Sequence, residues 1–289
     1  MFDICCVGHI TSDKVVNSRS VNYMPGGTAL YFSHALAKMD ARYLLVTAVA
    51  DPELRYVEGL RGAGIEVKAY PSEHTVFFEN IYAEDQDQRT QNVLAKSDPF
   101  SADQLADVEA KFFHLGPLLA DDFSLDVIKS LAGRGRISLD VQGYLREVRD
   151  QKVYATGWAE KVEALQYIDI IKADVGELQA LTGSADVKEG AHILASWGPT
   201  EIVITNGSHG SMIYNNGAFY DIPAYPPMEV IDATGCGDTY IAGYIYQRVK
   251  GASVEQAGHF AAAVSGLKTA VPGPFQGTED EVMDFMRSF

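Results

Sequence analysis

Short apolar runs alternate with amphipathic stretches along most of the chain. Six runs have the length and composition of buried strands: residues 2–8, 42–50, 111–115, 136–140, 168–172 and 201–205. Apolar residues recur at helical spacing between these runs, at 28–39, 53–60, 122–131, 159–165, 175–181 and 187–197. The chain ends in three further helical stretches, 239–249, 254–269 and 279–287. Such alternation indicates parallel βαβ units. We therefore predict a three-layer α/β fold around a mostly parallel central sheet.

Two stretches break this rhythm. Residues 14–24 are polar and strand-like, and residues 66–96 alternate β-branched or aromatic residues with polar ones, as in 76–82 (VFFENIY). Alternation with a period of two is typical of antiparallel strands that have one solvated face. We predict that both stretches are insertions that form a small β-sheet lid on a single domain spanning residues 1–289.

The charge of the chain excludes several classes of partner. Aspartate and glutamate total 39 against 23 lysines and arginines, a net charge of −16. A protein this acidic does not attract nucleic acid or anionic membranes through its overall field, so an anionic ligand needs a local binding site. The three cysteines do not form a disulfide framework, and the longest apolar run, 43–50, is too short to span a bilayer. We expect a soluble cytoplasmic protein without nucleic-acid or membrane partners.

The strongest chemical signal is the segment 232–238 (DATGCGD), which directly precedes an apolar helix. Two glycines at a helix entrance let backbone N–H groups point at an anion, and the helix dipole adds attraction. Asp238 lies on the first turn of that helix, where the dipole favours the ionised form that can accept a proton. An anion site beside a carboxylate base suits phosphoryl transfer to an alcohol. Taken alone, the pattern is more often a plain helix N-cap.

Two weaker patterns accompany this segment. Residues 205–210 (TNGSHG) lie between two strands and can bring a hydroxyl and backbone against nucleotide phosphates, although hairpin turns have the same composition. Asp174 and Glu177 follow a strand and start a helix. Their i, i+3 spacing places both carboxylates on one face, which suits a hydrated Mg²⁺ ion, and helix capping by Asp174 is the plainer interpretation.

In this order, the segments resemble the ribokinase-like (PfkB) family of sugar and nucleoside kinases. The similarity runs from Gly8 and Asp13 through the pair Gly26-Gly27 to residues 232–238, which are its most specific part. It implies a ribokinase-like α/β/α fold with a β-sheet lid, and a phosphotransferase that uses Mg²⁺ with ATP to phosphorylate an alcohol group. The lid of this family often also mediates dimerisation, so we include a homodimer among the expected partners.

The resemblance implies that Asp238 is the catalytic base. The anion hole would consist of the three residues before it, Gly235, Cys236 and Gly237. The residues that would contact ATP are Thr205, Gly207 and Gly210. Ala233 replaces the usual Thr or Pro, and Cys236 replaces the usual Ala. Both residues are small, so the anion hole is expected to survive.

The metal and acceptor residues also follow from the resemblance. Glu177 would help to hold Mg²⁺ through water, and Asp174 stands beside it where Asn is usual. Asp232 and Thr234 match positions near a monovalent-cation (K⁺) site in some members. The residues that would contact acceptor hydroxyls are Asp13, Gly26 and Gly27.

Other segments bear on the identity of the acceptor. In ribose kinases the double glycine leads into Lys-Gly-Ala-Asn, whereas Thr28 and Tyr31 stand here in place of the Lys and the Asn, which argues against ribose. Residues 26–33 (GGTALYFS), 116–119 (GPLL) and 140–146 (DVQGYLR) resemble the plant-type inositol kinases of the family. The favoured acceptor is therefore a cyclitol such as myo-inositol.

Three polar residues of segment 140–146 follow a strand end, where open α/β sheets bind ligands: Asp140, Gln142 and Arg146. Arg146 could offset phosphate charge, or pair with Glu147 or Asp150 at the surface. A sugar kinase of the ribose or fructose type, or a nucleoside kinase, is the alternative function on the same scaffold. A catalytically silent ligand-binding regulator is the third hypothesis, against which the presence of Asp238 argues.

Overall fold

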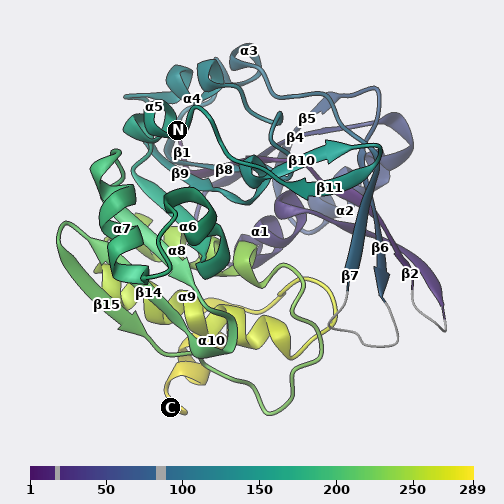
Figure 1. The fold of residues 1–289 in the computed structure, drawn as a ribbon. Coiled ribbons are helices and arrows are strands. Elements are labelled where there is room, and N and C mark those ends of the chain that lie inside the picture. The colour runs from purple at the N-terminus through teal and green to yellow at the C-terminus, as the bar shows by residue number, and fades with distance from the viewer. Residues whose placement is uncertain (17–19, 83–88) are drawn as a thin grey trace.

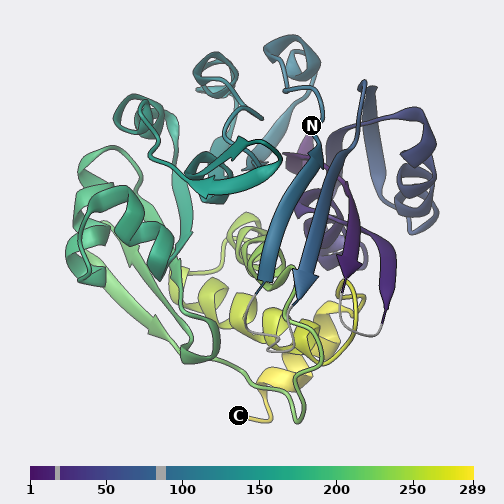
Figure 2. The same ribbon diagram turned by 45° about the vertical axis from the view of Figure 1, so that its right-hand side comes forward.

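The structure, a computed structural model, describes residues 1–16, 20–82 and 89–289. Residues 17–19 and 83–88, which belong to the two predicted insertions, lie outside the described residues. Within the described part, helices cover both faces of a nine-stranded sheet, and a six-stranded sheet stands beside it (Figure 1; Figure 2). This arrangement confirms the predicted three-layer α/β fold.

The nine-stranded sheet, called the large sheet below, is mostly parallel. Its strands are, from one edge to the other, β15 (Ala218–Ile222), β14 (Ser211–Asn215), β13 (Glu201–Thr205), β12 (Ile170–Asp174), β9 (Arg136–Asp140), β8 (Ala110–Gly116), β1 (Phe2–Gly8), β4 (Tyr43–Val49) and β5 (Glu66–Pro71). All strands from β13 to β5 pair in parallel, and β14 and β15 are antiparallel. The parallel strands therefore end at one common edge, where open α/β sheets bind ligands.

The large sheet is buried on both faces. In β1, Ile4 and Cys6 pack into one apolar core, and Cys5 and Val7 pack into another on the opposite face. The first core contains residues of α1 (Thr28–Leu36), α2 (Leu54–Gly62), α8 (Cys236–Val249), α9 (Val254–Thr269) and α10 (Glu279–Met286). The second contains residues of α3 (Ala102–Leu105), α4 (Leu125–Leu131), α5 (Lys161–Ala164), α6 (Val175–Thr182) and α7 (Val187–Ser196). Burial on both sides explains why these strands are continuous apolar runs in the sequence.

Most observed elements lie close to their predicted ranges. The strands 136–140 and 201–205 and the helix 254–269 coincide with the predictions. Helix α8 starts earlier than the predicted residue 239, because a glycine cap lets it begin at Cys236. Short 3₁₀ turns occur at η1 (Asp51–Glu53), η2 (Gln142–Leu145), η3 (Leu165–Tyr167) and η4 (Gly207–His209). No helix in the described residues combines the length and the apolar character needed to cross a bilayer.

The six-stranded sheet, called the lid sheet below, comes from three separate parts of the chain. Its strands are, in order, β10 (Arg146–Arg149), β11 (Lys152–Ala155), β7 (Arg89–Ala95), β6 (Val76–Tyr82), β2 (Thr11–Val16) and β3 (Val21–Gly26). Strands β2, β3, β6 and β7 fall largely in the predicted lid ranges 14–24 and 66–96. Two features differ from that prediction: β5 pairs with β4 in the large sheet, and the hairpin β10–β11 joins the lid sheet. Polar and apolar residues mix in β5 because it is an edge strand, in which Val67 alone is buried.

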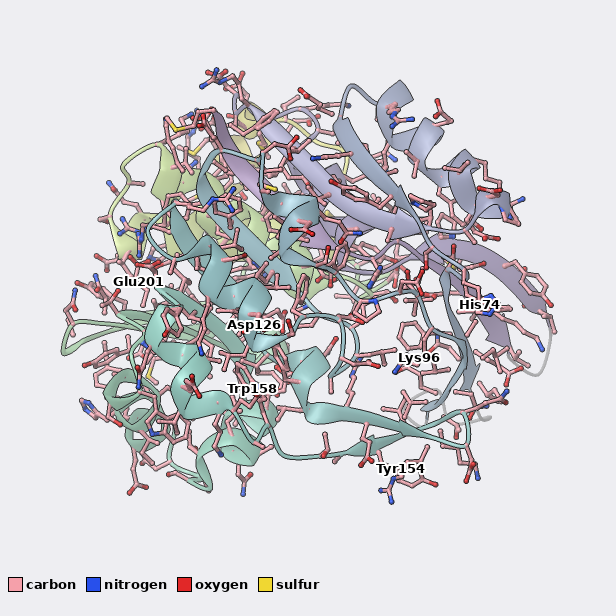
Figure 3. The ribbon with its side chains drawn as sticks, turned by 90° about the horizontal axis from the view of Figure 1, so that it is seen from above. His74, Lys96, Asp126, Tyr154, Trp158 and Glu201 are labelled. Atoms are coloured by element: carbon pink, nitrogen blue, oxygen red, sulfur yellow. The ribbon has the colours of Figure 1, made fainter. Side chains whose placement is uncertain are left out.

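A small apolar cluster lies between the lid sheet and the loop after β8. Its buried members are Val76, Phe78, Val93, Leu118 and Leu119. The hairpin β10–β11 projects toward the surface (Figure 3): Tyr154 on β11 is 41% exposed, whereas Trp158 beyond it is 7% exposed and stacks on Tyr144. One face of the lid sheet is thus available to cover the strand ends of the large sheet.

Dimerisation through the lid stays a prediction, which light scattering on the purified protein would check.

Candidate active site

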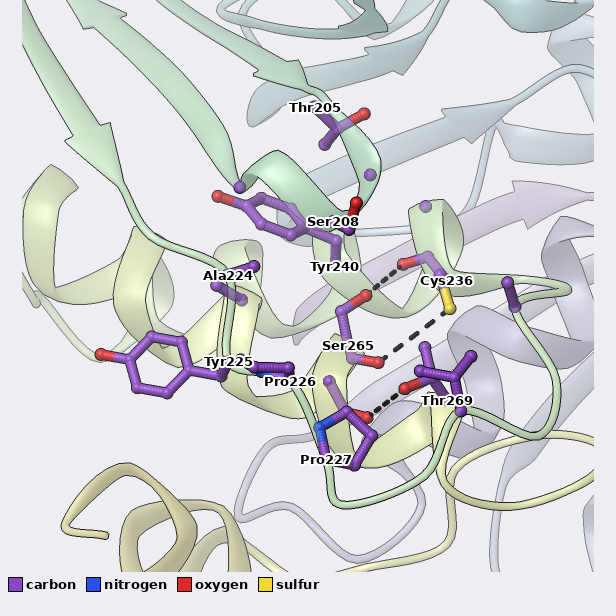
Figure 4. Close-up of a pocket in the computed structure, with 17 residues that line it drawn as sticks. Thr205, Ser208, Ala224, Tyr225, Pro226, Pro227, Cys236, Tyr240, Ser265 and Thr269 are labelled. Carbon is purple, nitrogen blue, oxygen red and sulfur yellow. Dashed lines mark hydrogen bonds between the residues drawn. The ribbon is translucent and has the colours of Figure 1, made fainter. Parts of the chain in front are cut away.

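Two cavities meet where the parallel strands of the large sheet end. The large cavity, of about 690 Å³, is lined by residues of the lid sheet, of β9 and β12, and of the start of α8. The small cavity, of about 330 Å³, is lined by the turn between β13 and β14, by α8 and by α9 (Figure 4). The residues that line both cavities are Thr205, Gly207, Ala233, Cys236 and Gly237. A molecule that spans the two cavities therefore passes the start of α8.

The start of α8 has the geometry of an anion site. Gly235, the N-cap residue, has a φ of 73°, a left-handed conformation that favours glycine. A Cβ on Gly235 would lie 2.1 Å from the ring of Tyr31, so no larger residue fits. Cys236, Gly237 and Asp238 form the first turn. The N–H of Cys236 donates to the carbonyl of Ala233 at 3.3 Å, whereas those of Gly237 and Asp238 have no acceptor within the helix. The helix dipole favours an anion there. The three residues predicted as the anion hole thus lie together at the junction of the cavities.

Asp238 lines the large cavity directly beside this anion site. Burial raises the pKa of Asp238, and the negative charge of Asp140 raises it further, while Lys172 and a hydrogen bond with Thr28 partly offset both effects. The result is a pKa of about 6. The carboxylate is therefore mostly ionised at neutral pH and gains a proton in mildly acidic solution, which suits a general base. Its catalytic role stays a prediction.

A buried ion pair that the sequence analysis missed lies next to Asp238. Lys172 on β12 and Asp140 on β9 are register partners, and Lys172 Nζ donates to Asp140 Oδ2 at 2.8 Å. Burial opposes both charges, but their attraction outweighs it, so the pKa of Lys172 is raised and that of Asp140 is lowered. A Cβ on Gly237 would lie 2.9 Å from Lys172 Nζ. The ammonium therefore faces the anion site. A lysine inside the apolar strand 170–174 was the available signal, because a buried charge needs a partner.

Asp174 and Glu177 lie at the end of β12 and in the first turn of α6. They form a capping box, in which Glu177 N–H donates to Asp174 Oδ1 and Asp174 N–H donates to Glu177 Oε2, each at 2.7 Å. Burial and the charge of Asp140 raise the pKa of Glu177 to about 7, although Lys172 acts in the opposite direction. The plainer interpretation of the sequence, helix capping, therefore describes these contacts. Asp174 lines the large cavity, whereas Glu177 is not among the described residues that line it. A water-mediated Mg²⁺ site at this pair stays a prediction.

Asp13 and the pair Gly26-Gly27 lie together where β2, β3 and α1 meet. Thr11 Oγ1 donates to Asp13 Oδ1 at 2.7 Å and so orients the carboxylate, which lines the large cavity. A Cβ on Gly26 would lie 2.4 Å from Asp13 Oδ2, and one on Gly27 (φ 84°) would lie 2.5 Å from the carbonyl oxygen of His9. The two glycines thus make room for the carboxylate and for the turn into α1.

Polar side chains of the lid sheet and of η2 complete the large cavity. Asn80 on β6 is 6% exposed, and its Oδ1 accepts a hydrogen bond from Gln91 Nε2 on β7 at 2.9 Å. Both residues line the cavity, as do Gln142 in η2 and Arg146 at the start of β10. The sequence predicted Gln142 and Arg146 but missed Asn80 and Gln91. The period-two alternation of the two lid strands was the signal that could have found them.

The small cavity is formed by main chain and by small or apolar side chains. Gly207 (φ 54°) and Gly210 (φ 91°) are both left-handed, and a Cβ on Gly210 would lie 2.2 Å from a carbonyl oxygen of β15. Ser265 Oγ on α9 donates to the carbonyl of Cys236 at 3.1 Å and so ties α9 to the start of α8 (Figure 4). None of the described residues that line this cavity carries a charge. The predicted ATP contacts Thr205, Gly207 and Gly210 all line it.

Asp232 and Thr234, predicted near a K⁺ site, lie in the loop that leads into α8. The N–H of Thr234 donates to Asp232 Oδ1 at 2.9 Å. Lys268 on α9 donates to two other oxygens of Asp232, the main-chain carbonyl at 2.7 Å and Oδ2 at 2.9 Å. Burial would raise the pKa of Asp232, but the hydrogen bonds from Lys268 and Thr234 outweigh it and lower the pKa below its ordinary value.

Comparisons with known proteins cover nearly the whole chain. A family profile described as pfkB family carbohydrate kinase matches residues 1–280. A cytidine kinase from Thermococcus kodakarensis is 28% identical over 272 residues, which cover 89% of this chain and 92% of that protein.

Two similar solved structures show the same fold. One is a sulfate complex of a pyrophosphate-dependent kinase in the ribokinase family, with 29% identity and a TM-score of 0.87; the match covers 97% of this chain and 99% of the other. The second is a pyrophosphate-dependent kinase of the ribokinase family complexed with a pyrophosphate analog and myo-inositol. It is 28% identical, has a TM-score of 0.85, and covers 97% of this chain and 99% of its own.

Proposed function

The chain belongs to the pfkB family of carbohydrate kinases and is a phosphotransferase that acts on a hydroxyl group; we propose that it uses Mg²⁺ with ATP to phosphorylate a cyclitol such as myo-inositol. The observation that carries this proposal is the meeting of two cavities at the start of α8, with Asp238 lining one of them. Such an arrangement brings a hydroxyl, a base and a phosphoryl group to one place. Family membership argues against the third hypothesis, a catalytically silent regulator.

In this proposal Asp238 accepts the proton of the acceptor hydroxyl. The hydroxyl oxygen forms a bond to the terminal phosphorus of the donor, and the bond from that phosphorus to the bridging oxygen breaks and releases ADP. N–H groups of the first turn of α8 stabilise the charge on the transferred group. Lys172, which Asp140 holds in place beside Gly237, adds positive charge at the same point.

The charges around the large cavity support a requirement for Mg²⁺. Its lining contains Lys172 and Arg146 but also five aspartates: Asp13, Asp140, Asp174, Asp232 and Asp238. A polyphosphate adds further negative charge, so a divalent cation has to accompany it. No group of three or more His, Cys, Asp or Glu side chains in the described residues could hold a metal alone. Asp174 and Glu177 would therefore hold Mg²⁺ through water, with phosphate oxygens as its other ligands, and the ion would neutralise the donor.

The small cavity supports a nucleotide as the donor. Its uncharged walls suit the base and ribose of ATP, and its opening at Gly237 leads the phosphates to the anion site. Pyrophosphate is a second candidate donor, because both similar solved structures are of pyrophosphate-dependent kinases. Pyrophosphate would use the anion site without filling the small cavity.

The side chains of the large cavity support an acceptor with several hydroxyl groups. Asp13, Asn80, Gln91 and Gln142 supply hydrogen-bond acceptors and donors around the space next to Asp238. Of the two similar structures, one contains myo-inositol, which favours a cyclitol. The similarity to a cytidine kinase favours a nucleoside as the alternative acceptor.

A matrix of donors against acceptors tests the proposal. ATP, other nucleoside triphosphates and pyrophosphate are each combined with inositol isomers, ketoses, aldoses and nucleosides, and the phosphate monoester is detected directly. The Asp238→Asn variant, purified in the same way, shows how much activity comes from contaminating kinases. We expect the highest kcat/KM with ATP and an inositol. Turnover of cytidine or adenosine with every inositol inert would overturn the cyclitol, and turnover with pyrophosphate alone would overturn ATP.

A further inference from the structure

A buried lysine lies behind the anion site. Lys268 is 0% exposed, and its ammonium donates to the carbonyl oxygen and to Oδ2 of Asp232 at 2.7 and 2.9 Å. The N–H of Gly273 donates to the same Oδ2 at 3.1 Å, and the ring of Tyr31 lies 5.6 Å from Lys268 Nζ. An ammonium group is costly to bury without partners. These contacts therefore explain how the fold accommodates a full positive charge at this point.

The residues around Asp232 do not fit the monovalent cation that the family resemblance implies. Such an ion would need carbonyl and carboxylate oxygens of the loop that contains Asp232 and Thr234. The carbonyl and Oδ2 of Asp232 already accept hydrogen bonds from Lys268. Oδ1 accepts the N–H of Thr234. A second positive charge a few ångströms from a buried ammonium would be strongly repelled.

We propose that Lys268 replaces the monovalent cation, and that its ammonium holds loop 232–235 in the conformation that the anion site needs, so that phosphoryl transfer does not depend on K⁺. The inference rests on the proposed kinase function. Lys268 is not among the described residues that line either cavity, so it is a positioning residue that acts through Asp232.

A short series of contacts links the ammonium to the anion site. Asp232, fixed by Lys268, accepts the N–H of Thr234 at 2.9 Å, and the next residue, Gly235, caps α8. Tyr31 connects the two ends directly, because its ring lies near Lys268 Nζ and also occupies the space beside Gly235. The main chain adds a second anchor, since the carbonyl of Thr269 accepts the N–H of Asp232 at 3.1 Å. Loss of the ammonium would therefore displace the loop and the start of α8, where the phosphoryl group would bind.

The ammonium of Lys268 resembles a monovalent cation in its charge: it carries one positive charge and offers three hydrogen-bond donors to oxygen atoms. It differs in being attached to the protein. Its tether keeps it at the site at any salt composition, whereas a dissolved cation leaves the site when its concentration falls. The loop should therefore keep its conformation when K⁺ is absent.

The first experiment compares salts in the donor–acceptor pair that the matrix identifies. At constant ionic strength, the wild-type enzyme is expected to have equal kcat/KM in K⁺, Na⁺ and choline. The Lys268→Met variant keeps the unbranched stem of the side chain and removes the terminal ammonium group. We expect its kcat/KM in choline to fall about 10- to 100-fold, as is typical when a supporting partner of a site is removed, and to recover in K⁺ or NH₄⁺. The Lys250→Met variant is the control, because Lys250 forms an exposed ion pair with Glu279. Its kcat/KM should equal that of the wild type and should not depend on the cation.

The second experiment does not depend on the substrate. Melting temperatures are measured for the wild type, Lys268→Met and Lys250→Met in K⁺ and in choline. K⁺ should raise the melting temperature of Lys268→Met alone, because binding to the folded state stabilises it. If Lys268→Met does not fold, Lys268→Gln takes its place. The response of the wild-type enzyme to K⁺ tests the proposal in either case. A donor–acceptor matrix without turnover would contradict the proposed function, while the melting experiment would still test the site.

Three results would overturn the proposal. The first is activation of the wild type by K⁺. The second is a folded Lys268→Met variant that keeps full activity in choline. The third is a folded, impaired variant whose activity does not respond to K⁺ or NH₄⁺ and whose melting temperature does not respond to K⁺, because Lys268 would then only fill space in the core.

Discussion

The two cavities share five lining residues, from the β13–β14 turn and the start of α8, but the rest of their walls differ in chemistry. The small cavity is bounded by glycine main chain and uncharged side chains, and its shape depends on close approaches such as that of Gly210 to β15. The large cavity is bounded by charged and polar side chains from both sheets, among them Asp13, Asn80 and Arg146. In the proposed function, main-chain N–H groups at the junction of the cavities would recognise what all phosphates have in common, whereas side chains of the large cavity would recognise the pattern of hydroxyls.

This difference separates what the fold fixes from what substitutions can change. An anion site made of N–H groups tolerates changes of side chain but not the addition of a Cβ where the chain is left-handed or crowded. An acceptor site made of side chains can change its specificity one residue at a time. The predictions below test this separation, starting with the largest expected effect.

Removal of the base is expected to cost the most. Asp238→Asn should fold and bind ATP normally but lose about 10²–10⁴-fold in kcat, because an amide cannot accept the proton of the acceptor hydroxyl. The measurements are steady-state kinetics and calorimetric titration with a non-hydrolysable ATP analogue. Near-wild-type turnover by this variant would show that Asp238 is not the base.

Addition of one carbon to the anion site should come next. In Gly235→Ala the new Cβ meets the ring of Tyr31, which displaces the first turn of α8, and the loss of aligned N–H donors should lower kcat about 10²–10³-fold. Gly133→Ala is the matched control, because Gly133 has a φ of 75° but no atom within 4 Å of its Cβ position. It should lose about 1–2 kcal/mol of stability from the left-handed conformation and no activity. Equal activity of the two variants would contradict the anion site.

A change on the acceptor side should affect only the acceptor. Asp13→Ala removes a carboxylate that lines the large cavity, and we expect kcat/KM for the acceptor to fall about 5- to 150-fold, with the KM for ATP unchanged. Lys14→Ala is the control on the same strand, because Lys14 pairs with Glu79 at 2.8 Å and does not line the cavity. A rise in the KM for ATP in Asp13→Ala would show that the two cavities are not separable in this way.

The pH dependence should show the smallest effect. Since the base works only when ionised, kcat/KM should fall about tenfold per pH unit below the pKa of about 6 of Asp238 and level off above it. The profile is measured at saturating Mg²⁺, because the pKa of Glu177 is about 7. Binding of the ATP analogue should not follow this profile. A rate that is flat from pH 5 to pH 8 would exclude Asp238 as the titrating base.

The elements that the sequence predicted well are those with one dominant local signal. Strand 201–205 contributes Val203 to one apolar core and Ile202 and Ile204 to the other, so its apolar run stands out whatever surrounds it. The segment 232–238 was identified because its glycines and Asp238 lie within a few residues of each other at the start of one helix. Even so, only Gly235 of its two glycines is left-handed, whereas Gly237 lies in α8 and is restricted by Lys172.

The features that the sequence missed depend on partners far away in the chain. The hairpin β10–β11 has short strands with alternate exposed residues, and only its pairing with β7 makes it part of the lid sheet. Lys172 and Lys268 lie in elements whose positions were predicted correctly. Their importance comes from Asp140 and Asp232, each more than thirty residues away, and no local pattern contains that information.

The way in which the lid sheet is assembled also bears on how the protein folds. Its strands β2 and β6 pair in parallel, with Asp13 opposite Phe78, so the chain between them must first cross through β3, α1, β4, α2 and β5. Closing so long a loop costs conformational entropy, which is offset only when the core has formed and its apolar surface is buried. The hairpin β10–β11 joins the lid sheet through a single register pair between β11 and β7, Lys152 opposite Asn92. The acceptor side of the active site should therefore form late in folding, and its amide hydrogens should exchange with solvent sooner than those of β1 and β8.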